Sequence, residues 1–149
     1  AKMLPKPEDV HAPIWCSISK DNCLKPIPGT VVYVLEVPED KVIYFDDVKW
    51  DYVLNRIYLP NNDEDAAAYK KHLKEIGVSN IFEFFEGRYK GMYPEEVEKI
   101  RESWKRAFRI DKWTIFNVCG NIWEIRKEWV RKIVHPGEEI PADTDLIEG

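Results

Sequence analysis

The chain has 149 residues, of which 44% are hydrophobic and 13% aromatic, and its formal net charge is −5. This length and composition predict one folded domain with a real core and exclude a disordered chain. No apolar run approaches the ~20 residues of a membrane span, and the first residues lack the apolar core of a signal peptide. Three cysteines without a Cys-x-x-Cys pair are typical of a reduced protein, so we expect a cytoplasmic protein without membrane contact.

The strongest structural signal is the stretch GTVVYVLEVPEDKVIYFDDVKWDYVLN. Its first run is almost continuously apolar and rich in β-branched residues, which predicts a covered strand over 30–37. A second run predicts a strand over 41–45, and the turn residues between the two runs favour a hairpin, although the loop could also lead away. Apolar residues with helical spacing follow a capping aspartate and predict a helix over 47–58.

The remaining segments contribute further strands and helices. Gly77 follows the apolar stripe of the expected helix 63–76, and glycine is common just after a helix end. Pro94 with Glu95 and Glu96 marks the start of the expected helix 95–109. The segment over 122–127 fits either the alternation of a strand, which we favour, or the start of a helix. We therefore expect strands over 12–18, 113–118 and 122–127 and helices over 63–76 and 95–109.

These elements together predict the α+β class. We expect a single domain over 1–134 with a mixed, mostly antiparallel sheet and three or more helices. The acidic residues 135–149 are expected to form a loosely held tail. The apolar residues expected to be largely buried are Trp15, Val32, Val34, Ile43, Trp50, Leu54, Trp104, Phe108, Ile115 and Ile125.

Charge is unevenly distributed along the chain. Between Lys99 and Lys132 there are ten Lys and Arg against four Asp and Glu, so this stretch carries +6 and the remainder −11. Arg101, Lys105 and Arg109 repeat every four residues and would share one face of the expected helix. Such a face is either simply solvated or attracts an anion such as a dinucleotide. The acidic remainder argues against nonspecific nucleic-acid binding.

Few residues have the pattern of a catalytic or metal site. The three histidines and three cysteines show no zinc-ligand spacing, so no metal is expected. Glu124 is the candidate catalytic carboxylate, because a carboxylate within the apolar segment NIWEIR must pair with a cation or serve a function. Trp123 and Arg126 are candidate binding residues beside it.

Four segments, in this order, resemble an uncharacterised bacterial family, the domain-of-unknown-function family 3841. They are APIWCSI, GTVVYVLEVPEDKVIYFDDVKWDYVLNRIYLP, ESWKRAFRID and IWEIRKEWVRKI, which together span residues 12–134. The family has no assigned activity, so this resemblance implies no function by itself. Its members usually carry a strand and a helix ahead of the first segment, where this chain has eleven residues.

The layout of IWEIRKEWVRKIV also resembles ADP-ribosyltransferases. In that fold a late strand brings a glutamate to the nicotinamide ribose, and the resemblance puts Glu124 in that place. It implies an NAD-consuming toxin or effector, with NAD as substrate and aromatic rings stacked on the nicotinamide. The carboxylate would stabilise an oxocarbenium-like transition state.

Three functions remain open from the sequence, and each predicts a different site. An ADP-ribosyltransferase or NAD glycohydrolase predicts a cleft that gathers Glu124, aromatic rings and a cation. A nonenzymatic module that binds a nucleotide or a protein predicts a basic face, with Glu124 ion-paired outside any cleft. A structural domain completed by a strand from a partner predicts an exposed apolar sheet edge near Ile14 or Val32.

Overall fold

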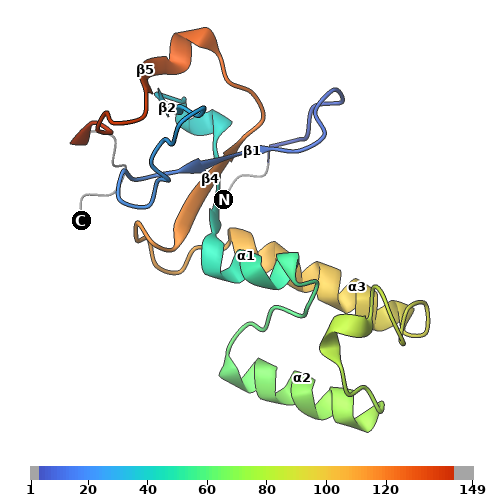
Figure 1. Cartoon of the computed structure of the whole chain (residues 1–149). Coiled ribbons are helices and arrows are strands. Elements are labelled where there is room, and N and C mark those ends of the chain that lie inside the picture. The colour runs from blue at the N-terminus through green and yellow to red at the C-terminus, as the bar shows by residue number, and fades with distance from the viewer. Residues whose placement is uncertain (1–3, 143–149) are drawn as a thin grey trace. The chain divides into compact units, whose positions relative to one another are not determined.

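The structure is a computed structural model of the whole chain and describes residues 4–142. The described residues form two compact units, and Figure 1 labels the three α-helices and the strands β1, β2, β4 and β5. Unit 1 combines residues 4–46 with residues 110–142, and unit 2 is the continuous segment 47–109. The expectation of a single domain over 1–134 stays a prediction.

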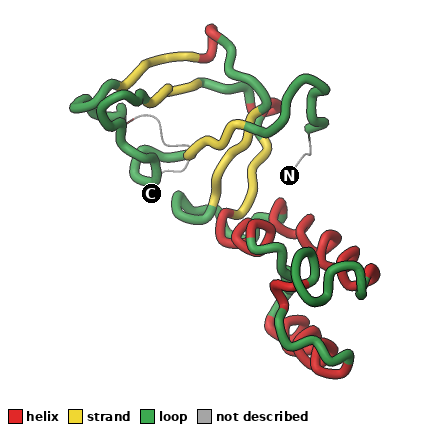
Figure 2. Tube along the Cα trace, turned by 45° about the vertical axis from the view of Figure 1, so that its right-hand side comes forward, coloured by secondary structure: helices red, strands yellow, loops and turns green. Residues whose placement is uncertain are grey.

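Unit 1 holds the strands, drawn in yellow in Figure 2. They form two small antiparallel sheets rather than one, with the orders β1-β4-β3 and β2-β5. Short 3-10 turns over Glu39–Lys41 and Lys127–Trp129 precede β3 and β5. The strands are β1 (Ile14–Ser17), β2 (Val32–Leu35), β3 (Ile43–Asp46), β4 (Val118–Ile122) and β5 (Val130–Val134).

The central strand β4 was not expected. The expected strands over 113–118 and 122–127 are wrong, because β4 fills the gap between them and shares only one residue with each, and every one of its residues is buried. Its sequence, VCGNI, has weak strand propensity, so pairing on both sides forms the strand. A Cβ atom at Gly120 would lie 3.0 Å from a methyl carbon of Val42, so glycine permits this close approach.

The favoured hairpin between the second and third strands does not form, and the loop between them leads away. β2 instead pairs with β5, with Val32 opposite Val134 and Tyr33 opposite Ile133. β5 was not expected as a strand. The expected tail begins beyond β5, and its residues 143–149 lie outside the described part of the chain.

Unit 2 holds the helices. They are α1 (Asp47–Leu54), α2 (Asp63–Glu75) and α3 (Pro94–Ser103), and a 3-10 segment over Trp104–Phe108 follows α3. The three expected helices are therefore confirmed, although each ends earlier than expected, and so is the α+β class. Local signals explain these helices: the side chain of Asn62 accepts a hydrogen bond from the amide of Asp65 at 2.8 Å, and Pro94 occupies the first turn of α3.

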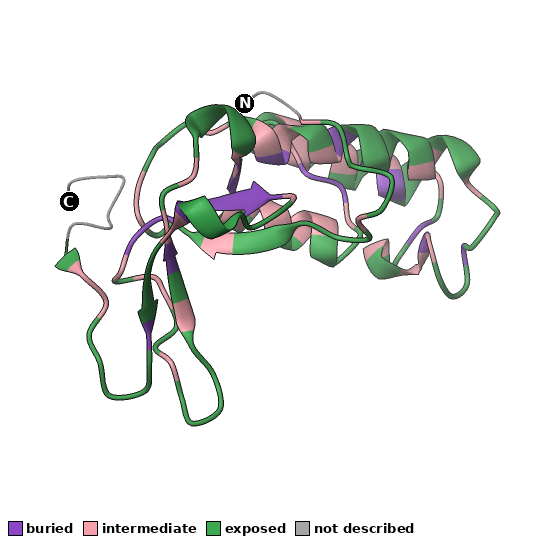
Figure 3. Ribbon diagram, turned by 90° about the horizontal axis from the view of Figure 1, so that it is seen from above, coloured by how far each residue is buried: buried purple, intermediate pink, exposed green. Residues whose placement is uncertain are grey.

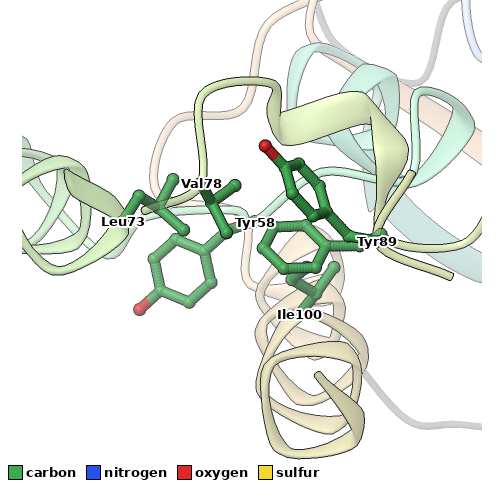
Figure 4. Close-up of a cluster of buried hydrophobic side chains, with 6 residues drawn as sticks. Tyr58, Leu73, Val78, Tyr89 and Ile100 are labelled. Carbon is green, nitrogen blue, oxygen red and sulfur yellow. The ribbon is translucent and has the colours of Figure 1, made fainter. Parts of the chain in front are cut away.

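The core of unit 2 forms where α2, α3 and the loop between them meet. Figure 4 shows its labelled side chains gathered around one another. At its border, the ring of Trp104 stacks on Phe85 with centroids 5.6 Å apart, and its indole nitrogen donates to the carbonyl of Ile57 at 2.8 Å. The buried members of the core are Tyr58, Leu73, Val78, Phe84, Tyr89 and Ile100.

Burial divides the expected core residues into three groups (Figure 3). Val34 and Ile43 are buried, as expected. Trp15, Leu54 and Ile125 are 49%, 60% and 41% exposed, so their expected burial is wrong. Trp15 lies on an edge strand, Leu54 ends α1, and Ile125 follows β4 in a loop. The half-buried residues are Val32, Trp50, Trp104, Phe108 and Ile115.

Candidate functional site

A cavity of about 620 Å³ in unit 1 is lined by residues of both sheets. This volume lies within the range of roughly 300–1,000 Å³ that is common for ligand sites. Most of its lining residues are aliphatic or aromatic, and the two charged ones, Glu36 and Arg131, form an ion pair of 3.7 Å. The cavity therefore offers a mainly apolar surface, and its two charged side chains neutralise each other.

The strands contribute to this cavity in two different ways. The segments of β3 and β4 contribute alternate residues, Val42 with Tyr44 and Gly120 with Ile122. β1 and β2 contribute consecutive residues, over 14–18 and 32–37. Successive side chains of a strand point to opposite faces. Therefore β3 and β4 present one face of their sheet, whereas β1 and β2 present their edges, including the backbone.

The edges that border the cavity have no neighbouring strand within the described part of the chain. β1 pairs with β4 alone and β2 with β5 alone, so each strand has one edge without a neighbouring strand there. Such an edge carries backbone donors and acceptors that can pair with another polypeptide. Exposed apolar side chains accompany these edges: Ile14 is 38% exposed and Tyr33 49% exposed. This is the exposed apolar sheet edge near Ile14 that one of the open functions predicts.

The cysteines at the cavity are poorly suited to nucleophilic chemistry. Burial raises the pKa of the Cys16 thiol to about 11, with smaller contributions from Cys119 and Cys23. Burial also raises the pKa of Cys23. Because the thiolate is the nucleophile, a raised pKa keeps both thiols protonated and unreactive near neutral pH.

Glu124 lies outside the lining of this cavity. It follows β4 in a loop rather than on a strand, and its side chain is 52% exposed. Its carboxylate accepts a hydrogen bond from Nε of Arg126 at 2.8 Å and forms an ion pair with Nη2 of the same residue at 2.6 Å, and this pairing raises the pKa of Arg126. Trp123 donates from its indole nitrogen to the carbonyl of Leu4 at 3.4 Å. The assignment of Glu124 as a catalytic group stays a prediction.

The predicted basic face belongs to unit 2. Lys105 pairs with Glu102 at 2.6 Å, and the guanidinium of Arg101 lies over the ring of Phe85 at 5.6 Å. Arg109 donates to the side-chain oxygen of Asn61 at 2.8 Å. The helix tightens to 3-10 geometry after Ser103, so a spacing of four residues no longer keeps these side chains in one row.

Sequence reasoning missed a group of polar contacts in unit 2. Asp65 accepts hydrogen bonds from the amide of Asn61 at 2.7 Å and from the hydroxyl of Tyr58 at 3.0 Å, and Arg106 lies 3.4 Å away. These contacts, the backbone one first, lower the pKa of Asp65. Since they lie within the unit that closes its own core, we assign them to stability rather than to a site.

Sequence reasoning also missed the cavity as a whole. The apolar runs that form β1 and β2 were recognised, but the sequence does not show that their edges border one space. In the described part of the chain, no three His, Cys, Asp or Glu side chains are placed to hold a metal ion. Nor does that part contain a helix with the length and apolarity needed to cross a membrane.

Comparisons with known proteins give one positive result. Searches of curated proteins and of solved structures each return no match. The resemblance to ADP-ribosyltransferases thus stays a prediction. A family model described as domain of unknown function (DUF3841) matches residues 1–131. Because this match covers most of the chain, the protein belongs to the DUF3841 family.

Proposed function

We propose that this protein is a nonenzymatic binding module and that the apolar cavity of unit 1 is its binding site. The observation that carries the proposal is the lining: an apolar space bordered by two strand edges that no described strand covers. Contiguous exposed apolar surface on a folded protein commonly marks an interaction site.

The chemistry of the lining supports binding over catalysis. Nucleophilic or acid–base catalysis needs a reactive group and a partner that activates it. The carboxylate among the described lining residues, Glu36, is already paired with Arg131, and the buried thiol of Cys16 has a raised pKa. Glu124, the sequence-based candidate, is paired with Arg126 outside this lining.

Burial of the exposed lining residues supplies the driving force for binding. Fully burying a large apolar side chain contributes roughly 1.5–3 kcal/mol. Ile14 and Tyr33 line the cavity and are 38% and 49% exposed, so each can lose further accessible surface when a ligand enters. An aspartate at either position would place a charge against that ligand.

An apolar fluorescent probe such as bis-ANS tests this proposal directly. We expect saturable binding to the wild type and at least a tenfold weaker affinity for Ile14→Asp. Ile133→Asp is the matched control, since Ile133 is 42% exposed on a strand of the same unit but does not line the cavity. Equal probe affinity for both variants, or no saturable binding to the folded wild type, would remove the cavity as the binding site.

The NAD-consuming alternative predicts a different set of results. An ADP-ribosyltransferase would release nicotinamide from NAD, and Glu124→Gln would lose that activity while keeping the fold, because the amide cannot carry the stabilising charge. We expect no nicotinamide release from the wild type and the same melting temperature for both proteins. Release by the wild type that disappears in Glu124→Gln would replace the binding proposal with the enzyme.

A further inference from the structure

We infer that the occupant of the cavity is an extended segment of another polypeptide that pairs as a β-strand with both β1 and β2. This inference rests on the proposed binding function and names its partner class. The observations that carry it are the residues that line the cavity and the pairing of the strands around it.

The first step of the argument concerns the backbone. Residues 14–18 and 32–37 line the cavity without a gap, although alternate side chains of a strand point to opposite faces. When consecutive residues of a strand all line the same space, the strand faces that space with its edge. The other edge of β1 is occupied by β4 and that of β2 by β5, so the edges at the cavity are the ones without a neighbouring strand in the described part of the chain.

The second step concerns what can satisfy those edges. An apolar small molecule would cover backbone amides and carbonyls without hydrogen bonds, and each buried unpaired polar group costs free energy. An extended main chain offers donors and acceptors with the matching spacing, as in recognition by strand addition. The free edges thus favour a polypeptide over a compact apolar ligand.

The third step concerns the resulting sheet. A segment between the two edges gives the strand order β3-β4-β1-segment-β2-β5, which joins both sheets of unit 1. β1 and β2 are four residues long, so the paired part of the segment is about as short. Neighbouring strands lie about 4.8 Å apart, so the two edges would be about 10 Å apart in the complex.

The cavity also defines the side chains of the segment. Ile14 and Cys16 border it from one face of β1, the strand beside which the segment would lie. Because successive residues of a strand alternate between faces, every second residue of the segment meets this surface and should be apolar. Glu36 and Arg131 neutralise each other, so a segment without net charge fits better than a charged one.

Three synthetic peptides of equal length test the inference with the full chain. The first alternates valine with threonine, the second has the same sequence with N-methyl groups on alternate amides, and the third has the same composition with the valines in one block. Affinity is measured by isothermal titration calorimetry, and amide hydrogen exchange reports which strands become protected.

We expect the alternating peptide to bind and to slow exchange at least tenfold in both β1 and β2. The N-methylated and block peptides should bind at least tenfold more weakly, because the first cannot donate at the blocked amides and the second cannot place its valines on one face. Ile14→Asp should weaken binding of the alternating peptide, and Ile133→Asp should leave its affinity unchanged.

Three results would overturn the inference. Equal affinity for the alternating and N-methylated peptides would show that main-chain pairing does not hold the occupant. Binding of the apolar probe without binding of any peptide would show a small-molecule site, which leaves the proposed binding function intact. Failure of both the probe and the peptides would reject the binding function together with the inference.

Discussion

The two units differ in how their backbones are satisfied. In unit 2 a continuous segment forms helices, whose hydrogen bonds lie within each element, and its apolar side chains close around Phe84 and Ile100, which are 1% and 0% exposed. In unit 1 every sheet pairs strands from the two ends of the chain, and β1 and β2 each keep an edge without a described neighbour. Strands depend on partners for their hydrogen bonds, so the unit made of strands is the one with an open binding edge.

The largest expected effect tests whether unit 2 has its own core and unfolds separately from unit 1. Phe84→Ala removes a large side chain from the core of unit 2 and should lower its stability by about 3–5 kcal/mol. Hydrogen exchange of the α2 and α3 amides, compared with those of β4, measures the loss in each unit. Faster exchange in β4 to the same extent would show that the two units unfold together and would break the comparison.

Asp65 tests the polar contacts of unit 2. Asp65→Asn removes an ionised acceptor of several hydrogen bonds and should cost about 1.5–3 kcal/mol. Since the folded state lowers the pKa of this carboxyl, its contribution is present above the unfolded pKa of about 3.9 and is lost as the pH falls through the folded value. Urea denaturation from pH 7 to pH 2 should therefore show a smaller acid-induced loss of unfolding free energy in Asp65→Asn than in the wild type. Parallel curves would assign the acid sensitivity to other groups.

Gly120 tests how tightly the sheet of unit 1 is packed. Gly120→Ala places a methyl group 3.0 Å from a carbon of Val42, and overpacking of this kind costs typically about 1–3 kcal/mol. Thermal denaturation should show the loss of stability, and faster hydrogen exchange of the β3 and β4 amides should locate it in these strands. Gly77→Ala is not a suitable control, because Gly77 has a φ of +76° that strains any other residue. Unchanged exchange in both strands would mean that the sheet adjusts without cost.

The smallest expected effect concerns a buried polar atom in unit 2. The hydroxyl of Tyr69 is buried and has no hydrogen-bond partner among the described residues. Burial, with the nearby carboxylate of Glu96, also raises the pKa of Tyr69. Removing an unsatisfied polar group is nearly neutral or stabilising, so Tyr69→Phe should unfold at the same urea concentration as the wild type or higher. A clear loss of stability would show that the hydroxyl is satisfied in solution.

Local signals in the sequence were enough to predict the helices and three of the strands. The cap at Asn62 and the proline at Pro94 act on residues within one turn, so they mark α2 and α3 without any tertiary information. The apolar runs that form β1, β2 and β3 are equally local signals. The α+β class followed from these elements alone.

β4 and the position of Glu124 could not be predicted in this way. The segment Cys119-Gly120-Asn121 reads as a break between strands, and it becomes the centre of a sheet because β1 and β3 supply hydrogen bonds on both sides. The chain leaves that strand at Ile122, so Glu124 reaches solvent and pairs with Arg126 instead of pointing from a strand. Both outcomes depend on residues far away in the sequence.

The sequence by itself thus determined where the helices and the apolar strands lie, because helix caps, turns and hydrophobic spacing act between neighbours along the chain. Only the tertiary structure decided which strands pair, and therefore which edges stay open around the cavity. Strand pairing joins residues such as Ile14 and Ile122 across more than a hundred positions, and short segments do not encode their partners. The candidate binding site is a product of that pairing, so it became visible only in the folded chain.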